Sequence, residues 1–363
     1  MFRLLCINLK HREINLTLNL EGDMTYLEKV QRDTSTKFWV NNPSIDECDV
    51  AIANGAFSCT TNPSYCAKLF QSDPTYIRKK IKTILDKPTK NVSIAEQVYH
   101  STTKDLMDRF LPMFKKTNGK QGFVTVQEDP RFEENHDYII EASLRAKDLG
   151  PNYMAKIPVT EHGLAVISAM VENNVPICAT EVFSISQAVL VYNIYKEASK
   201  KHSKTPPIFI THITGIMDQY FKDLVVKENI SISNEALKLA GTAVCLKQYN
   251  IFKQNNFNAI ILGGGARGLE HFTNFVGGDM HITINWSTAL ELNESYNEVE
   301  VSIDRKISDN IIDELLDKLP NFKRAWDENA MEIDEFADYG PVMLFRTQFM
   351  NGYSRLIDEI NIK

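Results

Sequence analysis

The chain has 363 residues, of which 43% are hydrophobic and 24% are charged, as is typical of globular proteins. Its formal net charge of −7 argues against nucleic acid as the main partner, because phosphate binding needs a basic surface. No apolar run approaches the roughly 20 residues of a membrane-spanning helix, so no membrane partner is expected. The start lacks a secretory pattern, and the six cysteines include no CxxC pair. We therefore expect a cytoplasmic protein with reduced thiols and no metal site.

Residues 1–36 form an N-terminal extension ahead of the main pattern. Within it, EINLTLNLEG (13–22) alternates apolar and polar residues and ends at a glycine. This alternation is typical of a strand that ends in a turn. We expect the extension to form a hairpin or a lid.

Eight short β-rich runs follow one another after this extension. Helical patterns with apolar residues three and four apart separate them, as in TEHGLAVISAMVENN (160–174) and SISQAVLVYNIYKEASKK (184–201). Thr160 and Ser184 are the expected N-caps of these two helices. The eight runs are KFWVN (37–41), FSCTT (57–61), GFVTVQ (122–127), YMAKIP (153–158), PICATEV (176–182), IFITHI (208–213), NAIILGG (258–264) and HITINW (281–286).

Alternating strands and helices predict parallel pairing, and eight units predict an α/β fold, a (β/α)8 TIM barrel over residues 37–297. An open doubly wound sheet is the alternative, but its glycine-rich turn would follow the first strand, where this chain has NNPSIDE (41–47). GGGARG (263–268) instead follows the seventh strand, where barrels often bind phosphate. Residues 298–363 are expected to be additional helices packed on the barrel. Whether they cover its mouth or form a homodimer contact is left open.

Lys156 is the charged residue in the fourth run, whose other five residues are apolar or aromatic. A bare ammonium is costly to bury, and burial lowers its pKa and frees a nucleophilic amine. Such an amine condenses with a ketone to a Schiff base, whose iminium withdraws electrons from a neighbouring carbon–carbon bond. The competing interpretation is a structural lysine that reaches solvent at the strand end or pairs with a carboxylate.

Strand alternation predicts which side chains accompany this lysine inside the barrel. Apolar residues are expected to form the floor, and amides and hydroxyls the rim. The expected inward residues are Trp39, Asn41, Thr125, Gln127, Met154, Pro158, Cys178, Thr180, Phe209, Thr211 and Ile213.

Five segments, taken together and in this order, resemble a known family. They are KFWVNNPSIDECDVAIANGAFSCTTNPSYCAKL (37–69), MAKIPVTEHGLAVISAMVENNVPICATEVFSISQA (154–188), THITGIMDQY (211–220), AIILGGGARGLEHFTNFVGGDMHITI (259–284) and MEIDEFADYGPVMLFRTQFMNGYSRL (331–356). Through them the chain resembles the transaldolase family, within the class I Schiff-base aldolase superfamily, over most of its length. The resemblance implies a TIM barrel that acts as a cytoplasmic transferase of carbohydrate metabolism in the pentose phosphate pathway, with a lysine nucleophile and no cofactor.

The resemblance assigns catalytic roles to four positions. Lys156 takes the place of the Schiff-base lysine, and Thr180 that of the threonine that positions the catalytic water. Asn41 stands where the family has an aspartate that shuttles the proton of the hydroxyl at the cleaved bond. Gln127 stands where the family has a glutamate that works through a water in Schiff-base formation, as in the fructose-6-phosphate aldolase branch. Glu128 is adjacent but faces the opposite way on a regular strand.

The resemblance also assigns substrate contacts. Asn62, in TTNPS, falls on an asparagine that contacts the substrate hydroxyls, with Thr61 beside it. Thr211 replaces a serine of the substrate wall. Arg267 matches one of two phosphate-binding arginines, and the glycine-rich backbone before it is available to phosphate oxygens. Other departures are Gly265 for a serine, Ile216 for the second arginine and Ile213 for an aromatic residue.

His212 is, by residue type, the first candidate for a replacement acid or base, because its unperturbed pKa is near neutral. Strand alternation turns it toward the helices, so a structural histidine is the competing interpretation. Glu181, Asp218 and Tyr220 are weaker candidates. Glu181 is expected to face outward beside Thr180 and to pair with a basic helix residue.

Three functions are consistent with these residues. The first is a transaldolase-like aldol transferase or aldolase that acts through Lys156 on a small-molecule carbohydrate, a ketose or related polyhydroxy carbonyl compound. Its substrate would be shifted from ordinary sugar phosphates, because one phosphate-binding arginine is missing. The second is a non-catalytic binding or scaffold protein, favoured by the two lost carboxylates and opposed by the retained Lys156, Asn62 and Thr180. The third is a Schiff-base dehydration or isomerisation.

Overall fold

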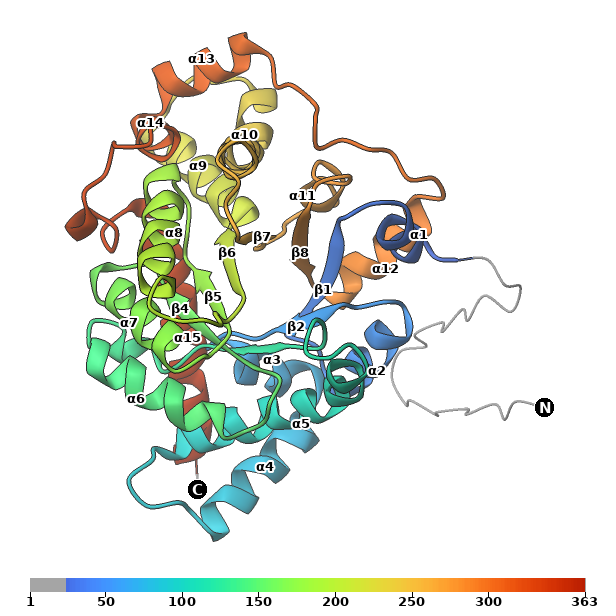
Figure 1. Ribbon diagram of the computed structural model, residues 1–363, viewed down its shortest axis with the longest axis vertical. Coiled ribbons are helices and arrows are strands. Elements are labelled where there is room, and N and C mark those ends of the chain that lie inside the picture. The colour runs from blue at the N-terminus through green and yellow to red at the C-terminus, as the bar shows by residue number, and fades with distance from the viewer. Residues whose placement is uncertain (1–23, 363) are drawn as a thin grey trace.

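The computed structural model describes residues 24–362, so the hairpin or lid expected over 13–22 lies outside the described residues. Eight parallel strands close into a barrel in chain order, with helices around them (Figure 1). The predicted TIM barrel is therefore confirmed. The strands are β1 (Lys37–Asn41), β2 (Ser58–Thr60), β3 (Val124–Val126), β4 (Tyr153–Pro158), β5 (Ile177–Thr180), β6 (Ile208–His212), β7 (Ile260–Gly263) and β8 (Met280–Ile284).

The helices cover the outside of the barrel with their apolar faces turned inward. In Figure 1, α13 and α14 lie at one end of the long axis and α4 at the other. The helices are α1 (Tyr26–Asp33), α2 (Ile45–Ala53), α3 (Tyr65–Ser72), α4 (Pro74–Asp86), α5 (Ile94–Lys116), α6 (His136–Lys147), α7 (Glu161–Glu172), α8 (Ile185–Ser199), α9 (Thr214–Glu228), α10 (Asn234–Gln254), α11 (Glu270–Thr273), α12 (Trp286–Ser295), α13 (Asp309–Lys318), α14 (Pro320–Trp326) and α15 (Gly340–Asn361), with short 3-10 turns at η1 (Pro130–Phe132) and η2 (Ile333–Glu335).

A small apolar cluster fills the inside of the barrel. The Trp39 indole donates to His281 Nδ1 at 2.8 Å and meets the Phe209 ring edge-on, with centroids 5.0 Å apart. This cluster closes the barrel from below, so polar groups at the opposite strand ends face one mouth. Its buried members are Trp39, Phe123, Met154, Cys178, Phe209 and Leu262, which include the apolar floor residues expected from strand alternation.

Two predicted helix caps attach the helices to the strands at this mouth. The hydroxyl of Thr160 accepts from the amide of Gly163, and that of Ser184 accepts from the amide of Gln187. The Gln187 side chain also donates to the carbonyl oxygens of Val159 and Glu181, both at 3.1 Å. The start of α8 therefore fixes the backbone that follows β4 and β5.

Gly163 is the point of closest approach between α7 and the end of β4. A Cβ atom there would lie 1.8 Å from the carbonyl oxygen of Pro158. We expect Gly163→Ala to lower the free energy of unfolding by at least about 2 kcal/mol, because backbone must move to make room. Denaturant unfolding measures this loss. Gly150→Ala is the control, since its nearest neighbour is the flexible Met107 side chain, and an equal loss in both variants would contradict the prediction.

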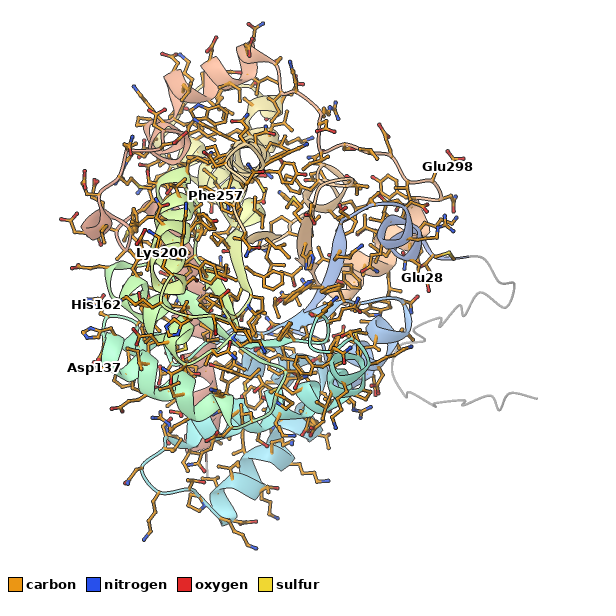
Figure 2. The ribbon with its side chains drawn as sticks, in the orientation of Figure 1. Glu28, Asp137, His162, Lys200, Phe257 and Glu298 are labelled. Atoms are coloured by element: carbon orange, nitrogen blue, oxygen red, sulfur yellow. The ribbon has the colours of Figure 1, made fainter. Side chains whose placement is uncertain are left out.

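The described part of the N-terminal extension packs on the outside of the barrel. The Leu27 amide of α1 donates to the Asn293 side chain of α12 at 3.0 Å, and the rings of Tyr26 and Tyr296 are 5.3 Å apart. Figure 2 shows Glu28 and Glu298 at this same edge of the molecule. No helix among residues 24–362 is long and apolar enough to cross a membrane.

Helix α15 lies over the mouth of the barrel. Its Gln348 carbonyl accepts from the Ser64 hydroxyl at 3.0 Å, and the Phe345 ring meets Phe183 edge-on. Phe345, Gln348 and Phe349 reach the cavity below. Of the two placements left open by the sequence, the structure therefore shows the C-terminal helix at the mouth.

Candidate functional site

A cavity of about 270 Å³ lies between α15 and the carboxyl ends of the strands. Side chains from β1, β2, β4 to β8, the loops that follow them, α3 and α15 line it. Among the described residues, its lining includes three cations, Lys68, Lys156 and Arg267, and no carboxylate. Hydroxyls and amides supply most of its other polar surface. The cavity thus suits a polyhydroxy ligand that carries negative charge.

Lys156 lies in the wall of this cavity, as strand alternation predicts. It is only 6% exposed, and its Nζ donates to the carbonyl oxygen of Thr61 at 3.3 Å. The Phe349 ring of α15 covers the ammonium, 5.5 Å from Nζ to the ring centroid. Burial lowers the pKa of Lys156, and the charge of Glu181 offsets only part of this effect. The amine is therefore shifted toward its neutral, nucleophilic form.

Two threonines present hydroxyls to the cavity next to the lysine. Thr180 of β5 and Thr211 of β6 are buried in its wall, and neither Oγ1 has a hydrogen-bond partner among residues 24–362. Thr61 does not share this arrangement, although it was expected to contact substrate. Its hydroxyl donates to the Thr125 carbonyl at 2.6 Å and hydrogen-bonds with the Tyr99 hydroxyl at 2.9 Å. The group of Thr61 that contacts Lys156 is its carbonyl oxygen.

Asparagine side chains form the β1 and β2 side of the cavity. Asn41 donates to Asn285 Oδ1 at 3.1 Å and accepts from the Thr60 hydroxyl at 3.0 Å. Asn62 also lines the cavity, and its Oδ1 accepts from the Ser64 amide at 3.0 Å, which fixes the side chain. This side therefore offers amide and hydroxyl groups suited to sugar hydroxyls.

Gln127 and Glu181 form a buried pair behind the cavity, and here the sequence prediction is wrong. Glu181 was expected to face outward, but it is fully buried and accepts from Gln127 Nε2 at 3.0 Å. The strand ends at Thr180, and the backbone φ of +64° at Glu181 breaks the alternation. Burial raises the pKa of Glu181 to about 7, against the lowering effects of the Gln127 hydrogen bond and the charges of Lys156 and Arg346.

The glycine-rich segment after β7 forms the opposite wall. A Cβ atom at Gly265 would lie 2.7 Å from Ile213 and 3.0 Å from Ile216, so these two isoleucines leave no room for a serine. Arg267 stands at the rim, and its Nη1 donates to the carbonyl oxygens of Gly265 and Ala266. The wall beside Gly265 is therefore apolar, and Arg267 is the cation of this segment in the cavity lining.

The backbone of this segment is less available to an anion than the sequence indicated. The amides of Arg267 and Gly268 both donate to Nδ1 of His271, at 3.0 and 3.2 Å. The other ring nitrogen of His271 lies 2.8 Å from Oδ2 of Asp218. The second carboxylate oxygen of Asp218, Oδ1, accepts from the Gly241 amide. Asp218 is therefore part of a buried network that holds the loop, outside the cavity lining.

The other acid–base candidates also lie outside the cavity lining. His212 is fully buried against α10, with Nε2 3.1 Å from the Gly241 carbonyl oxygen, and burial lowers its pKa to about 4. It faces the helices, as strand alternation predicts. The Tyr220 hydroxyl accepts from the Asn321 side chain at 2.5 Å. Neither side chain lies where it could move a proton on a ligand in this cavity.

One cluster among the described residues has the composition of a metal site. Potential ligand atoms of Glu96, His100 and Glu128 lie within 4.8 Å of one another, on the helix side of β3. Arg145 donates to both oxygens of Glu96, and His100 Nε2 lies 3.3 Å from Glu128. Burial lowers the pKa of His100, but the charges of Glu128 and Glu96 and the hydrogen bond with Glu128 together raise it by more. The pKa of His100 is therefore above its usual value. Arg145 and His100 thus pair with Glu96 and Glu128, and the cluster is a buried polar network whose ligand atoms are already engaged.

Several cavity residues were missed by the sequence reasoning, among them Lys68, Thr283, Asn285 and the α15 residues Phe345, Gln348 and Phe349. Thr283 and Asn285 would have been found if strand alternation had been extended along β8, because they are two positions apart. Lys68 lies on α3, where its Nζ donates to the Asn42 carbonyl at 2.8 Å. Its place at the cavity depends on the turn between β2 and α3, whose geometry no local sequence pattern indicates.

Comparisons with known proteins show the family of the chain. The family model for transaldolase/fructose-6-phosphate aldolase matches residues 38–338. The chain is similar to a transaldolase of Thiobacillus denitrificans, with 22% identity over 83% of this chain and 88% of that protein. It is also similar to a transaldolase of Campylobacter jejuni, 24% over 60% of this chain and 67% of that protein, and to one of Kocuria rhizophila, 31% over 39% of each.

Proposed function

Because the chain belongs to the transaldolase/fructose-6-phosphate aldolase family, we propose that it is a Schiff-base aldol enzyme with Lys156 as nucleophile. Family membership supports transaldolase-like aldolase activity in general. One observation carries the assignment to Lys156: a buried amine in the wall of a polar cavity, whose pKa is lowered by burial. A neutral amine attacks a ketone, whereas an ammonium cannot.

The Lys156 amine adds to the ketone carbon to give a neutral carbinolamine. The carbinolamine takes up a proton and loses water to give an iminium. Removal of a proton from the hydroxyl two carbons away breaks the intervening carbon–carbon bond, and its electron pair moves into the iminium. An aldehyde leaves, and an enamine stays on the lysine. The enamine then attacks an aldehyde acceptor, or takes up a proton and is released by water.

The remaining cavity residues fit a polyhydroxy substrate. Asn41, Asn62 and Asn285 offer amides on one side, and Thr180 and Thr211 offer hydroxyls that lack protein partners. A buried hydroxyl without a partner costs free energy until a ligand or water satisfies it. These groups would therefore orient the substrate hydroxyls around the reacting carbon.

We propose that the substrate is shifted away from tightly held sugar phosphates. Arg267 alone faces an apolar wall of Ile213 and Ile216, where a second cation would be needed to clamp a terminal phosphate. Two of the loop amides are already bound to His271. A phosphate would then be held mainly by one guanidinium.

Arg267→Ala measures that single contact. Hydrogen bonds to charged groups contribute about 1.5–3 kcal/mol, so KM for a phosphorylated ketose should rise roughly 10- to 100-fold. KM for the same ketose without its phosphate should stay near the wild-type value. Initial rates with the two ketoses test this, and an equal change for both would show that Arg267 does not bind phosphate.

The competing function is a non-catalytic binding protein, and Asn41 is the observation that favours it. An amide at this position cannot accept the proton released when the bond breaks. Product analysis by mass spectrometry separates the two functions. The protein would be incubated with fructose 6-phosphate and with unphosphorylated ketoses, with and without an aldose phosphate acceptor.

The proposal predicts a new ketose when the acceptor is present, or a free three-carbon ketone if the enzyme is a lyase. Either product should be absent with Lys156→Ala. If folded wild-type protein gives no product from any ketose, the binding function replaces the enzymatic one.

A further inference from the structure

Glu181 has a backbone conformation that stands out in this chain. Seven non-glycine residues among the described part of the chain have a positive φ, and six of them are asparagines; the seventh is Glu181, at +64°. Asparagine tolerates this region, whereas for most other residues it costs roughly 1–3 kcal/mol and persists where the surroundings enforce it. Backbone outliers of this kind cluster at functional sites, so the Glu181 side chain is a candidate for a functional role.

The Glu181 carboxyl is buried outside the cavity lining, and its charge and that of Lys156 act on each other. Oε1 accepts from Gln127 Nε2 at 3.0 Å, while Oε2 has no partner among residues 24–362. Gln127 Oε1 and Thr180 Oγ1 are likewise buried without a partner among these residues. Three buried oxygens on these side chains thus lack partners among these residues. Each costs free energy until a water or a ligand satisfies it.

Charged groups in three segments interact with this carboxyl. Lys156 of β4 and Arg346 of α15 favour its ionised form, and its own charge raises the pKa of Glu133, in the turn after η1. Arg346 Nε lies 2.8 Å from Glu133 Oε1, and its Nη2 lies 2.9 Å from Glu134. Burial, together with the nearby Glu181, raises the pKa of Glu133 to about 9 despite Arg346. Two buried carboxyls therefore share the influence of one guanidinium, and a proton is retained between them at neutral pH.

We propose that Glu181 is the residue that exchanges protons with the Lys156 intermediate during Schiff-base formation. This inference rests on the proposed function of Lys156. Position 127 offers an amide, which can donate a hydrogen bond but cannot accept a proton in this range of pH. Glu181 supplies the missing carboxyl at the same place and is aligned by that amide.

In the proposed step, Glu181 supplies the proton with which water leaves the carbinolamine. The neutral Lys156 amine adds to the ketone, and one amine proton moves to the new oxygen, which leaves a neutral carbinolamine. The protonated Glu181 carboxyl then gives its proton to the carbinolamine hydroxyl, which departs as water. The nitrogen lone pair forms the C=N bond, and an iminium–carboxylate pair results. Hydrolysis at the end of the cycle runs in reverse and returns the proton to Glu181.

The test is the rate at which ketose becomes attached to Lys156, trapped with borohydride at timed intervals and read by intact mass. Glu181→Gln keeps the shape and an acceptor for Gln127, but removes the exchangeable proton. We expect its rate of adduct formation to fall about 10²-fold or more, within the range for a positioned acid or base. Glu128→Gln, which removes a buried carboxyl on the helix side of the same segment, should form adduct at the wild-type rate.

The pH dependence of the rate of adduct formation is a second test. The pH dependence of the wild-type rate should include a falling limb near pH 7, where Glu181 loses its proton, given its pKa of about 7. Glu181→Gln should lack the falling limb. The absence of any falling limb in the wild type would overturn the proposal even if the variant does not fold.

The double variant Gln127→Glu/Glu181→Gln exchanges the amide and the carboxyl. It therefore distinguishes a role of the carboxyl in proton transfer from a structural role of Glu181. If a carboxyl at this place is what matters, the exchange should recover most of the lost rate. A slow double variant would assign Glu181 a structural role instead. A wild-type rate of adduct formation in Glu181→Gln would reject the proposed role of Glu181 but not the role of Lys156 as nucleophile. A wild type that forms no adduct would reject both the proposed function and this inference.

Discussion

Lys156→Ala is expected to abolish turnover while leaving the fold unchanged. Without the Lys156 amine, the iminium that takes up the electron pair of the broken bond does not form. Because enzymes accelerate reactions by about 10⁶-fold or more, the loss should be at least about 10⁴-fold. The variant removes a charge that is costly to bury, so it should unfold as cooperatively as the wild type. Initial rates of aldehyde or ketose formation, with thermal unfolding of the same sample, measure both effects.

Lys37→Ala is the matched control for this variant. Lys37 also lies on a barrel strand and also has a pKa lowered by burial, but its Nζ donates to the carbonyls of Gln31 and Thr34, at the end of β1 opposite the cavity. Its replacement should leave turnover near the wild-type value. Normal turnover in Lys156→Ala would contradict the mechanism, and equal loss in both variants would point to general damage to the barrel.

Asn41→Asp is expected to raise activity toward fructose 6-phosphate by roughly 10²- to 10⁴-fold, the usual contribution of a positioned base. The surroundings can accept the change. The Thr60 hydroxyl already donates to Oδ1, and the Asn285 amide can turn to donate where it now accepts. The new carboxylate would then remove the hydroxyl proton as the carbon–carbon bond breaks. The steady-state kcat at several pH values measures the gain.

Asn42→Asp is the control for this substitution, since Asn42 also lines the cavity and aspartate tolerates its positive φ of 46°. It adds the same charge one residue away without the hydrogen bonds to Thr60 and Asn285. Equal activity in both variants at every pH would mean that the apolar phosphate wall, and not the missing base, limits the reaction with sugar phosphates.

The barrel could be predicted because its sequence signals are local. All eight runs became strands, since each alternates or clusters apolar residues between polar turns. Alternation along β4 also placed Lys156 correctly, because β4 is regular from Tyr153 to Pro158. Its register with β5 aligns Lys156 with Cys178, which confirms that they share the inner face.

The site was predicted less completely because its key contacts depend on where the strands end. The structural strand β5 stops at Thr180, and the next residue adopts a conformation that glutamate rarely takes, so the alternation rule sent Glu181 to the wrong side. The cover that Phe349 provides over Lys156 is likewise a contact between residues far apart in the chain. No pattern within one segment records such a contact.

The measurement that tests the central claim most directly is intact-mass spectrometry after borohydride reduction of the protein with phosphorylated and unphosphorylated ketoses. The account predicts a covalent adduct of ketose mass on the wild type, with fragmentation that places it on Lys156 and no adduct on Lys156→Ala. The ketose that reacts would identify the substrate class. The absence of an adduct with every ketose, from protein shown to be folded, would contradict the account and leave a transaldolase-family barrel that binds its ligand without chemistry.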